Sequence, residues 1–86
     1  MTPKIFFCIS IFDLVRYKNE VEEFGITLRK LRDAANLSQQ DLADEAEISK
    51  RTVQRLEKGQ YSATLDIVFA LAEALKIKAK DFFDRE

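Results

Sequence analysis

The sequence contains no histidine and no tryptophan, and its 86 residues include a single cysteine, Cys8. Without histidine there is no histidine acid or base for catalysis, and with one cysteine there is no Cys/His zinc site. One cysteine cannot form a disulfide within the chain, which fits a reducing cytoplasm. The scattered carboxylates offer no pairing of nucleophile and base. We therefore expect a cytoplasmic protein that is not an enzyme and uses no cofactor or metal.

Glycine and proline are also scarce, with two glycines and one proline, whereas 47% of the residues are hydrophobic and 34% are charged. This composition is typical of a folded, helical chain rather than a disordered one. A chain of this length has room for one small domain with a modest core. Its net charge is −1, from 14 basic and 15 acidic residues. Taken over the whole chain, that balance argues against a generally basic nucleic-acid binder.

An uncharged hydrophobic run, IFFCISIF, covers residues 5–12. It is far shorter than the ~20 residues of a membrane helix, and Asp13 ends it without a signal-peptide cleavage site. Its isoleucines and phenylalanines favour a strand, although an extra helix stays open. Because an exposed run of this kind promotes aggregation, it must be covered. We interpret residues 1–17 as an apolar N-terminal arm that adds to the core of its own chain, serves as a dimerisation or partner segment, or is a mobile or spurious extension.

The remaining residues, 18–86, predict short helices with brief connections. Apolar residues at helical spacing predict helices over 21–35, 39–46, 50–58, 65–75 and 79–84. Favourable N-cap residues precede three of these helices, namely Ser38, Ser49 and Thr64. Asn36 and Gly59 follow two of them, where a left-handed residue commonly ends a helix. The sequence therefore predicts an all-α domain.

Residues 39–58 form a helix-turn-helix candidate, because only residues 47–49 join two short predicted helices. The apolar residues that we expect to fill the angle between the helices are Leu42, Ile48, Val53 and Leu56. Ala43 is small at the point where the second helix must come close.

The predicted helix 50–58 has one apolar side and one cationic side. At about 100° per residue, an arc of roughly 140° contains Lys50, Arg51, Gln54, Arg55 and Lys58, with Val53 and Leu56 opposite. The four cations and the single acid, Glu57, give this helix a charge of about +3 in a chain whose net charge is −1. Such a helix can enter the major groove of DNA, where arginine reads guanine and glutamine reads adenine.

These segments resemble the phage-repressor helix-turn-helix family, the Cro/C1 or xenobiotic-response-element type. The resemblance covers about residues 22–83 and rests on LRKLR at 28–32, LSQQDLA at 37–43, IS at 48–49, VQRLEKG at 53–59 and LAEAL at 71–75. It implies a compact five-helix, lambda-repressor-like domain that binds double-stranded DNA, usually as a homodimer on a palindromic operator. In this chain the domain carries the apolar N-terminal extension in addition.

The resemblance also implies a set of DNA contacts. Lys50, Arg51 and Arg55 fall where the family presents side chains to base edges. Gln39 is implied to bind a backbone phosphate with help from the helix N-terminus. The further backbone candidates are Gln40, Ser49, Thr52, Lys58 and the loop 60–62. Arg32 and Glu57, by contrast, stand at positions that form a partly buried, structural ion pair in similar proteins.

Two positions depart from the family pattern, because Glu47 and Lys76 stand where glycine is usual. A side chain in a left-handed turn costs roughly 1 kcal/mol. Glu47 also brings an acid close to the expected DNA phosphates, which weakens binding. The family has no standard segment that corresponds to residues 1–17.

The interpretation we favour is a sequence-specific DNA-binding transcription regulator, most simply a repressor that reads a palindromic operator through residues 50–58. One alternative is an antitoxin-type regulator whose N-terminal arm binds a toxin. Another is a protein–protein adaptor that retains the fold without binding DNA. Glu47 and the weak net charge favour the adaptor, and the cationic face argues against it.

Overall fold

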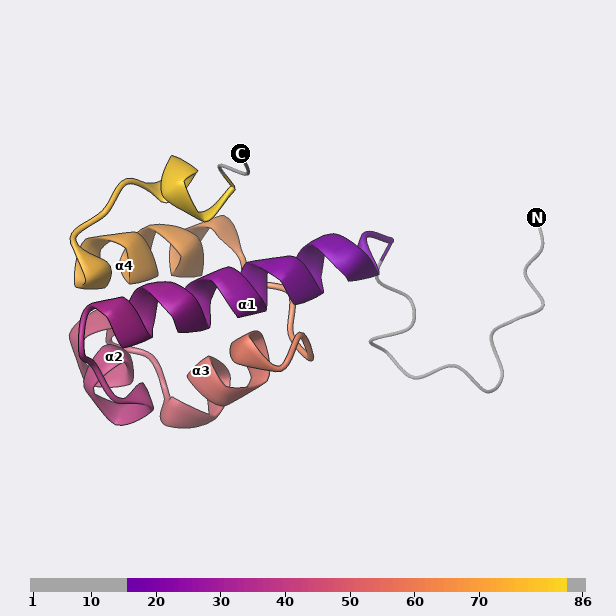
Figure 1. Ribbon diagram of the computed structural model, residues 1–86. Coiled ribbons are helices and arrows are strands. Elements are labelled where there is room, and N and C mark those ends of the chain that lie inside the picture. Colours follow the sequence, from indigo (N-terminus) through magenta and orange to yellow (C-terminus); the bar gives the residue numbers. More distant parts are fainter. Residues whose placement is uncertain (1–15, 84–86) are drawn as a thin grey trace, which may run out of the picture.

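The computed structural model describes residues 16–83, so the expectations for the arm over residues 1–15 lie outside the described residues. The described part contains helices and no strand (Figure 1). Its elements are α1 (Lys18–Ala34), α2 (Gln39–Ala46), α3 (Lys50–Glu57), α4 (Leu65–Leu75) and the 3₁₀ helix η3 (Ala79–Phe82). No described helix is long and apolar enough to cross a membrane.

Four of the five predicted helices are confirmed as α-helices. The helices α2 and α4 have the expected bounds, α3 ends one residue early, and α1 begins at Lys18 instead of Val21. The prediction of a fifth α-helix over 79–84 was wrong in its type, because residues 79–82 form a 3₁₀ helix. Here Asp81 N–H donates to the Lys78 carbonyl at 2.9 Å and Phe83 N–H to the Lys80 carbonyl at 2.9 Å. These bonds span three residues rather than four, as in the short 3₁₀ pieces that connect or end helices.

The three predicted N-caps are confirmed by their hydrogen bonds. The Ser38 hydroxyl accepts from Asp41 N–H at 2.9 Å, and the Asp41 carboxylate accepts from Ser38 N–H at 3.2 Å, which completes a capping box. The Ser49 hydroxyl accepts from Thr52 N–H at 3.0 Å, and that of Thr64 accepts from Ile67 N–H at 3.3 Å. These side chains set the starts of α2, α3 and α4.

Left-handed residues end four helical segments, as predicted. Gly59 has a φ of 71°, and Asn36, Glu47 and Lys76 have φ values of 62°, 60° and 61°. Glu47 and Lys76 therefore adopt the conformation in which a side chain is disfavoured.

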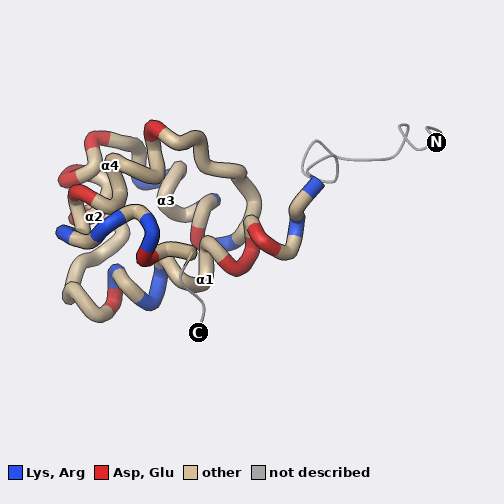
Figure 2. Tube along the Cα trace, turned by 90° about the horizontal axis from the view of Figure 1, so that it is seen from above, with Lys and Arg blue, Asp and Glu red and all other residues tan. Residues whose placement is uncertain are grey.

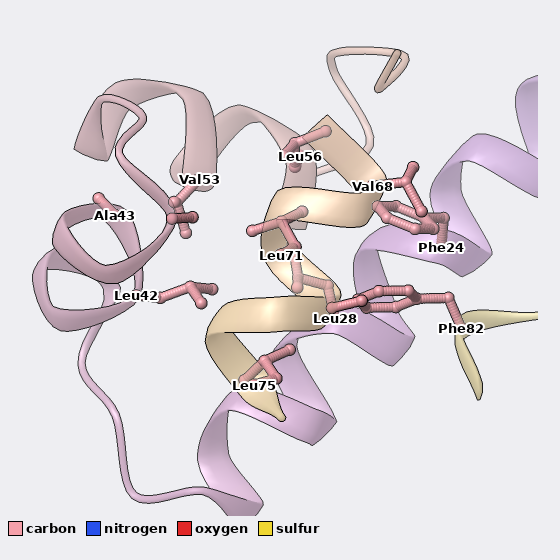
Figure 3. Packing of buried hydrophobic residues seen from close by; sticks show 12 residues of the cluster. Phe24, Leu28, Leu42, Ala43, Val53, Leu56, Val68, Leu71, Leu75 and Phe82 are labelled. Carbon is pink, nitrogen blue, oxygen red and sulfur yellow. The ribbon is translucent and has the colours of Figure 1, made fainter. Parts of the chain in front are cut away.

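The core lies between α1, α2, α3 and α4, and Leu71 of α4 lies near its centre (Figure 3). Its fully buried members are Leu28, Leu42, Ala43, Val53, Leu56 and Leu71. Three of the four residues predicted between α2 and α3 are thus completely buried, whereas Ile48 is half-buried against the core. At the other end, the Phe24 ring lies 5.0 Å from that of Phe82, so η3 closes the core over α1.

The backbones of α1 and α3 approach closely at Gly25, a contact that the sequence alone did not reveal. A Cβ at Gly25 would collide with the Leu56 carbonyl oxygen and would lie 3.1 Å from the Glu57 carbonyl oxygen. Glycine is therefore required in the middle of α1, although it weakens an isolated helix.

We expect Gly25→Ala to destabilise the domain by about 1–3 kcal/mol, the usual cost of overpacking, despite the higher helix propensity of alanine. Urea unfolding followed by circular dichroism measures the change. The control is Lys30→Ala, an exposed site on the same helix, which should change the free energy of unfolding by less than about 0.5 kcal/mol. A Gly25→Ala chain as stable as the control would show that α1 and α3 can move apart at little cost.

Candidate nucleic-acid interface

The helix α3 carries an outer face that no other described element covers. Val53 and Leu56 are completely buried against α1 and α2. The four cations of the helix and its C-cap are exposed, namely Lys50, Arg51, Arg55 and Lys58. In Figure 1, α3 lies at the lower edge of the domain, away from α4 and η3. The predicted division into an apolar side and a cationic side is thus confirmed.

None of these four cations forms an ion pair with another described residue. The only acid within α3, Glu57, is held by Arg32, and Figure 2 shows charges of both signs distributed around the described domain. Cations without acidic partners are free to neutralise phosphates and to release the counterions bound to DNA.

A polar hollow of ≈ 190 Å³ opens on this face and is lined by Arg51, Gln54, Arg55, Lys58 and Gln60. Gln60 reaches it because left-handed Gly59 turns the chain back along the helix. Gly59 N–H donates to the Leu56 carbonyl at 3.1 Å and Gln60 N–H to the Arg55 carbonyl at 2.8 Å. This is the Schellman pattern. The side-chain amides of Gln54 and Gln60 therefore lie on the same face as the cations. Gly59 was the residue from which the turn could be predicted in the sequence.

Two hydroxyls lie at the N-terminus of α3. Ser49 Oγ and Thr52 Oγ1 are 2.8 Å apart and share one hydrogen bond, while Ser49 Oγ also accepts from Thr52 N–H. Whichever hydroxyl donates in the shared bond, the proton of the other remains available. The capping role predicted for Ser49 is therefore confirmed.

The two glutamines that begin α2 are both engaged with carboxylates. Gln39 Nε2 donates to Glu57 Oε1 at 3.0 Å, which leaves its second amide proton available. Gln40 Nε2 donates to Asp44 Oδ1 at 2.8 Å. The sequence did not indicate either bond. The bond from Gln40 places the Asp44 carboxylate beside the amide for which the family resemblance implies a phosphate contact.

Arg32 and Glu57 form the predicted ion pair between α1 and α3. Arg32 Nε lies 2.6 Å from Glu57 Oε2, and Nη2 lies 3.1 Å from Oε1. The exposed fractions of the two side chains are 10% and 4%. The remaining arginine nitrogen, Nη1, donates to the Leu37 carbonyl at 2.8 Å. The pair thus connects α1, α3 and the loop before α2.

The hydrogen bond with Glu57 raises the pKa of Arg32 above its ordinary value, although burial opposes the shift. A raised pKa adds stability that is fully present below the pKa of the unfolded chain and is lost only as the pH rises through the folded-state value. Since the ordinary pKa of arginine already lies far above neutrality, Arg32 keeps its charge from neutral to mildly alkaline pH.

Glu47 is the acid closest in sequence to the start of α3, and it is exposed in the turn between α2 and α3. Asp44 and Glu45 of α2 are also exposed. These acids oppose the attraction that the α3 cations exert on DNA.

Among the described residues, no group of acidic or cysteine side chains could hold a metal ion.

Known proteins resemble this chain in sequence and in structure. The helix-turn-helix family profile HTH_3 matches residues 28–82. An uncharacterised HTH-type transcriptional regulator of Methanocaldococcus jannaschii is 36% identical over 56 residues, which cover 65% of this chain and 85% of that protein. Control protein C.BamHI of Bacillus amyloliquefaciens is 31% identical over 62 residues, 71% of this chain and 76% of that protein. The crystal structure of the restriction-modification controller protein C.AhdI from Aeromonas hydrophila aligns with a TM-score of 0.74 and 35% identity, covering 76% of this chain and 98% of that one.

We expect Glu57→Leu to destabilise the domain by about 3–5 kcal/mol, because it leaves the buried Arg32 charge with only the largely exposed Asp33 carboxylate, 3.5 Å from Nη1, as an acidic partner. The double variant Arg32→Met/Glu57→Leu should recover much of that loss, since apolar side chains of similar volume can replace a buried pair. Urea unfolding at pH 7 and pH 9 provides the free energies, and the loss should be the same at both values.

The exposed pair of Arg29 and Asp33, 3.9 Å apart and 68% and 61% exposed, is the matched control. Arg29→Ala should cost less than about 1 kcal/mol, as surface pairs usually do. If Glu57→Leu costs no more than this control, the buried pair does not hold α1 and α3 together.

Proposed function

The chain belongs to the HTH_3 helix-turn-helix family of DNA-binding transcription regulators, and from this premise we propose that it represses transcription by binding a palindromic operator as a homodimer. The observation that carries the proposal is the outer face of α3, whose four cations have no acidic partner among the described residues. This face is the surface that inserts into the major groove of DNA.

In this proposal Lys50, Arg51 and Arg55 contact base edges. All three are exposed on α3, and arginine can bind guanine O6 and N7 with two hydrogen bonds. Gln54 and Gln60 lie in the same hollow as the two arginines, and their amides match the donor and acceptor of adenine. The arginines provide most of the discrimination between sequences.

Gln39 binds a backbone phosphate with the amide proton that its bond to Glu57 leaves available. Because Glu57 is held by Arg32, the Gln39 amide is oriented before DNA arrives. The free hydroxyl proton of Ser49 or Thr52, the amide of Gln40 and the ammonium group of Lys58 add further backbone contacts. Contacts of this kind set the position of α3 in the groove and carry no sequence information.

We expect Arg51→Ala/Arg55→Ala to weaken binding to the operator by about 5- to 150-fold for each arginine, which corresponds to about 1–3 kcal/mol per bidentate contact. The operator is first selected from a random DNA pool with the unmodified protein. Fluorescence anisotropy at fixed salt then gives the dissociation constants.

The control variant Lys30→Ala/Lys80→Ala removes the same charge from exposed positions on α1 and η3. It should keep the sequence preference and lose only a small electrostatic contribution. If the two double variants bind the operator equally well, α3 does not read the bases.

A homodimer on a palindrome should protect two half-sites whose centres lie one helical turn apart, about 10–10.5 base pairs, or a multiple of that distance. Hydroxyl-radical footprinting on the selected operator measures the spacing. The affinity should also fall with salt, with a log–log slope of about −0.9 per phosphate neutralised. Protection of one half-site only, at all protein concentrations, would contradict the dimer.

A further inference from the structure

An apolar face lies over the middle of α1 and over the end of η3. We call it the Phe83 face, and it consists of Phe83, Ile26 and the outer edge of Phe24. Phe83 is 59% exposed and Ile26 is 53% exposed, although the Phe83 ring stacks on Phe24 with centroids 5.9 Å apart. Since Phe24 also contacts Phe82, the face is the outer layer of one aromatic cluster rather than a set of isolated side chains.

Two hollows flank Phe83, with volumes of ≈ 320 Å³ and ≈ 160 Å³. Glu20, Phe24 and Phe83 line both of them, while Ile26 belongs to the larger and Tyr61 to the smaller. A cavity of about 150 Å³ can hold a benzene ring. Each hollow therefore has room for an aromatic or branched aliphatic side chain.

No described element covers the Phe83 face. Phe83 and Ile26 are each more than half exposed to solvent. Contiguous apolar patches on a small domain commonly mark a place where another segment packs.

We propose that residues 5–12 of the same chain pack on the Phe83 face. This run, IFFCISIF, has no charge and contains three phenylalanines and three isoleucines. Both the run and the Phe83 face are apolar, and each would otherwise be exposed to water. Packing the run on the face removes both surfaces from water. The proposal concerns the side of α1 toward η3, whereas α3 lies on the other side (Figure 1), so it is independent of DNA binding.

The connection is long enough for the run to reach the face. Residues 13–15 separate the run from Arg16, which forms a turn with Tyr17, and three residues can span up to about 10 Å at ~3.3 Å each. Phe24 lies only about 9 Å along α1 from Lys18 at 1.5 Å per residue.

The tether also favours the chain's own segment over that of a second copy. A short tether gives an effective concentration in the millimolar range, which exceeds the concentration of a separate copy in dilute solution. The experiment must therefore distinguish packing of the chain's own residues 5–12 from packing of the same run of a second copy on this face.

The single natural cysteine, Cys8, lies within the run and makes a direct test possible. Three full-length variants place a second cysteine along the wall of the larger hollow, namely Glu23→Cys, Ile26→Cys and Lys30→Cys. Oxidised glutathione accepts the electrons as the two thiols join, and two molecules of reduced glutathione leave. We expect at least one variant to form a disulfide within one chain, at a rate independent of protein concentration, as judged by peptide mass spectrometry without reduction.

The control is Glu73→Cys, an exposed site near the end of α4, which lies away from the first turns of α1 (Figure 1). The variants on α1 should close about tenfold or more faster than this control, because the tether concentrates Cys8 near the face. A disulfide between two chains, forming in proportion to protein concentration, would show that a second copy covers the face and would overturn the proposal. Closure no faster than in the control would overturn it as well, and circular dichroism verifies that each variant is folded.

Discussion

The ion pair between Arg32 and Glu57 is the interaction on which the arrangement of the candidate interface depends. It joins α1 to the last residue of α3, and the same two side chains also hold the Leu37 carbonyl and the Gln39 amide. A buried pair of this kind contributes little net free energy compared with apolar packing, but breaking it leaves a charge without a partner. Its role is therefore to specify geometry: it fixes the end of α2 that carries Gln39 relative to α3.

Close packing at Gly25 acts on the same pair of helices. The absent side chain lets α1 lie directly against the carbonyl groups of Leu56 and Glu57, one of which belongs to the ion-paired residue. The crossing of α1 and α3 is thus set by steric contact and by charge within the same turn of α3. The apolar side of α3 is fully occupied by this contact and by the core, which leaves its cationic side for a partner.

The local features of the fold could be predicted from the sequence, and the features that depend on distant contacts could not. The caps Ser38, Ser49 and Thr64 were predictable because each bonds a backbone group three residues away. The partnership of Arg32 and Glu57 came from the family resemblance rather than from spacing. The requirement for Gly25 and the bond from Gln39 to Glu57 were not predictable, since both depend on segments at least 18 residues apart. The 3₁₀ form of η3 was missed because so short an apolar segment gives the same pattern in either helix type. The assignment of base and phosphate contacts remains a prediction.

The left-handed conformation of Glu47 and Lys76 has a consequence for how long the protein persists in a cell. Each of these side chains costs roughly 1 kcal/mol relative to glycine, and about 2 kcal/mol changes the ratio of folded to unfolded molecules by about 30-fold. Proteases remove unfolded chains continuously, so differences of this size alter steady-state abundance several-fold. Two residues in turns outside the cationic face of α3 thereby influence how much of the protein is present, through its turnover.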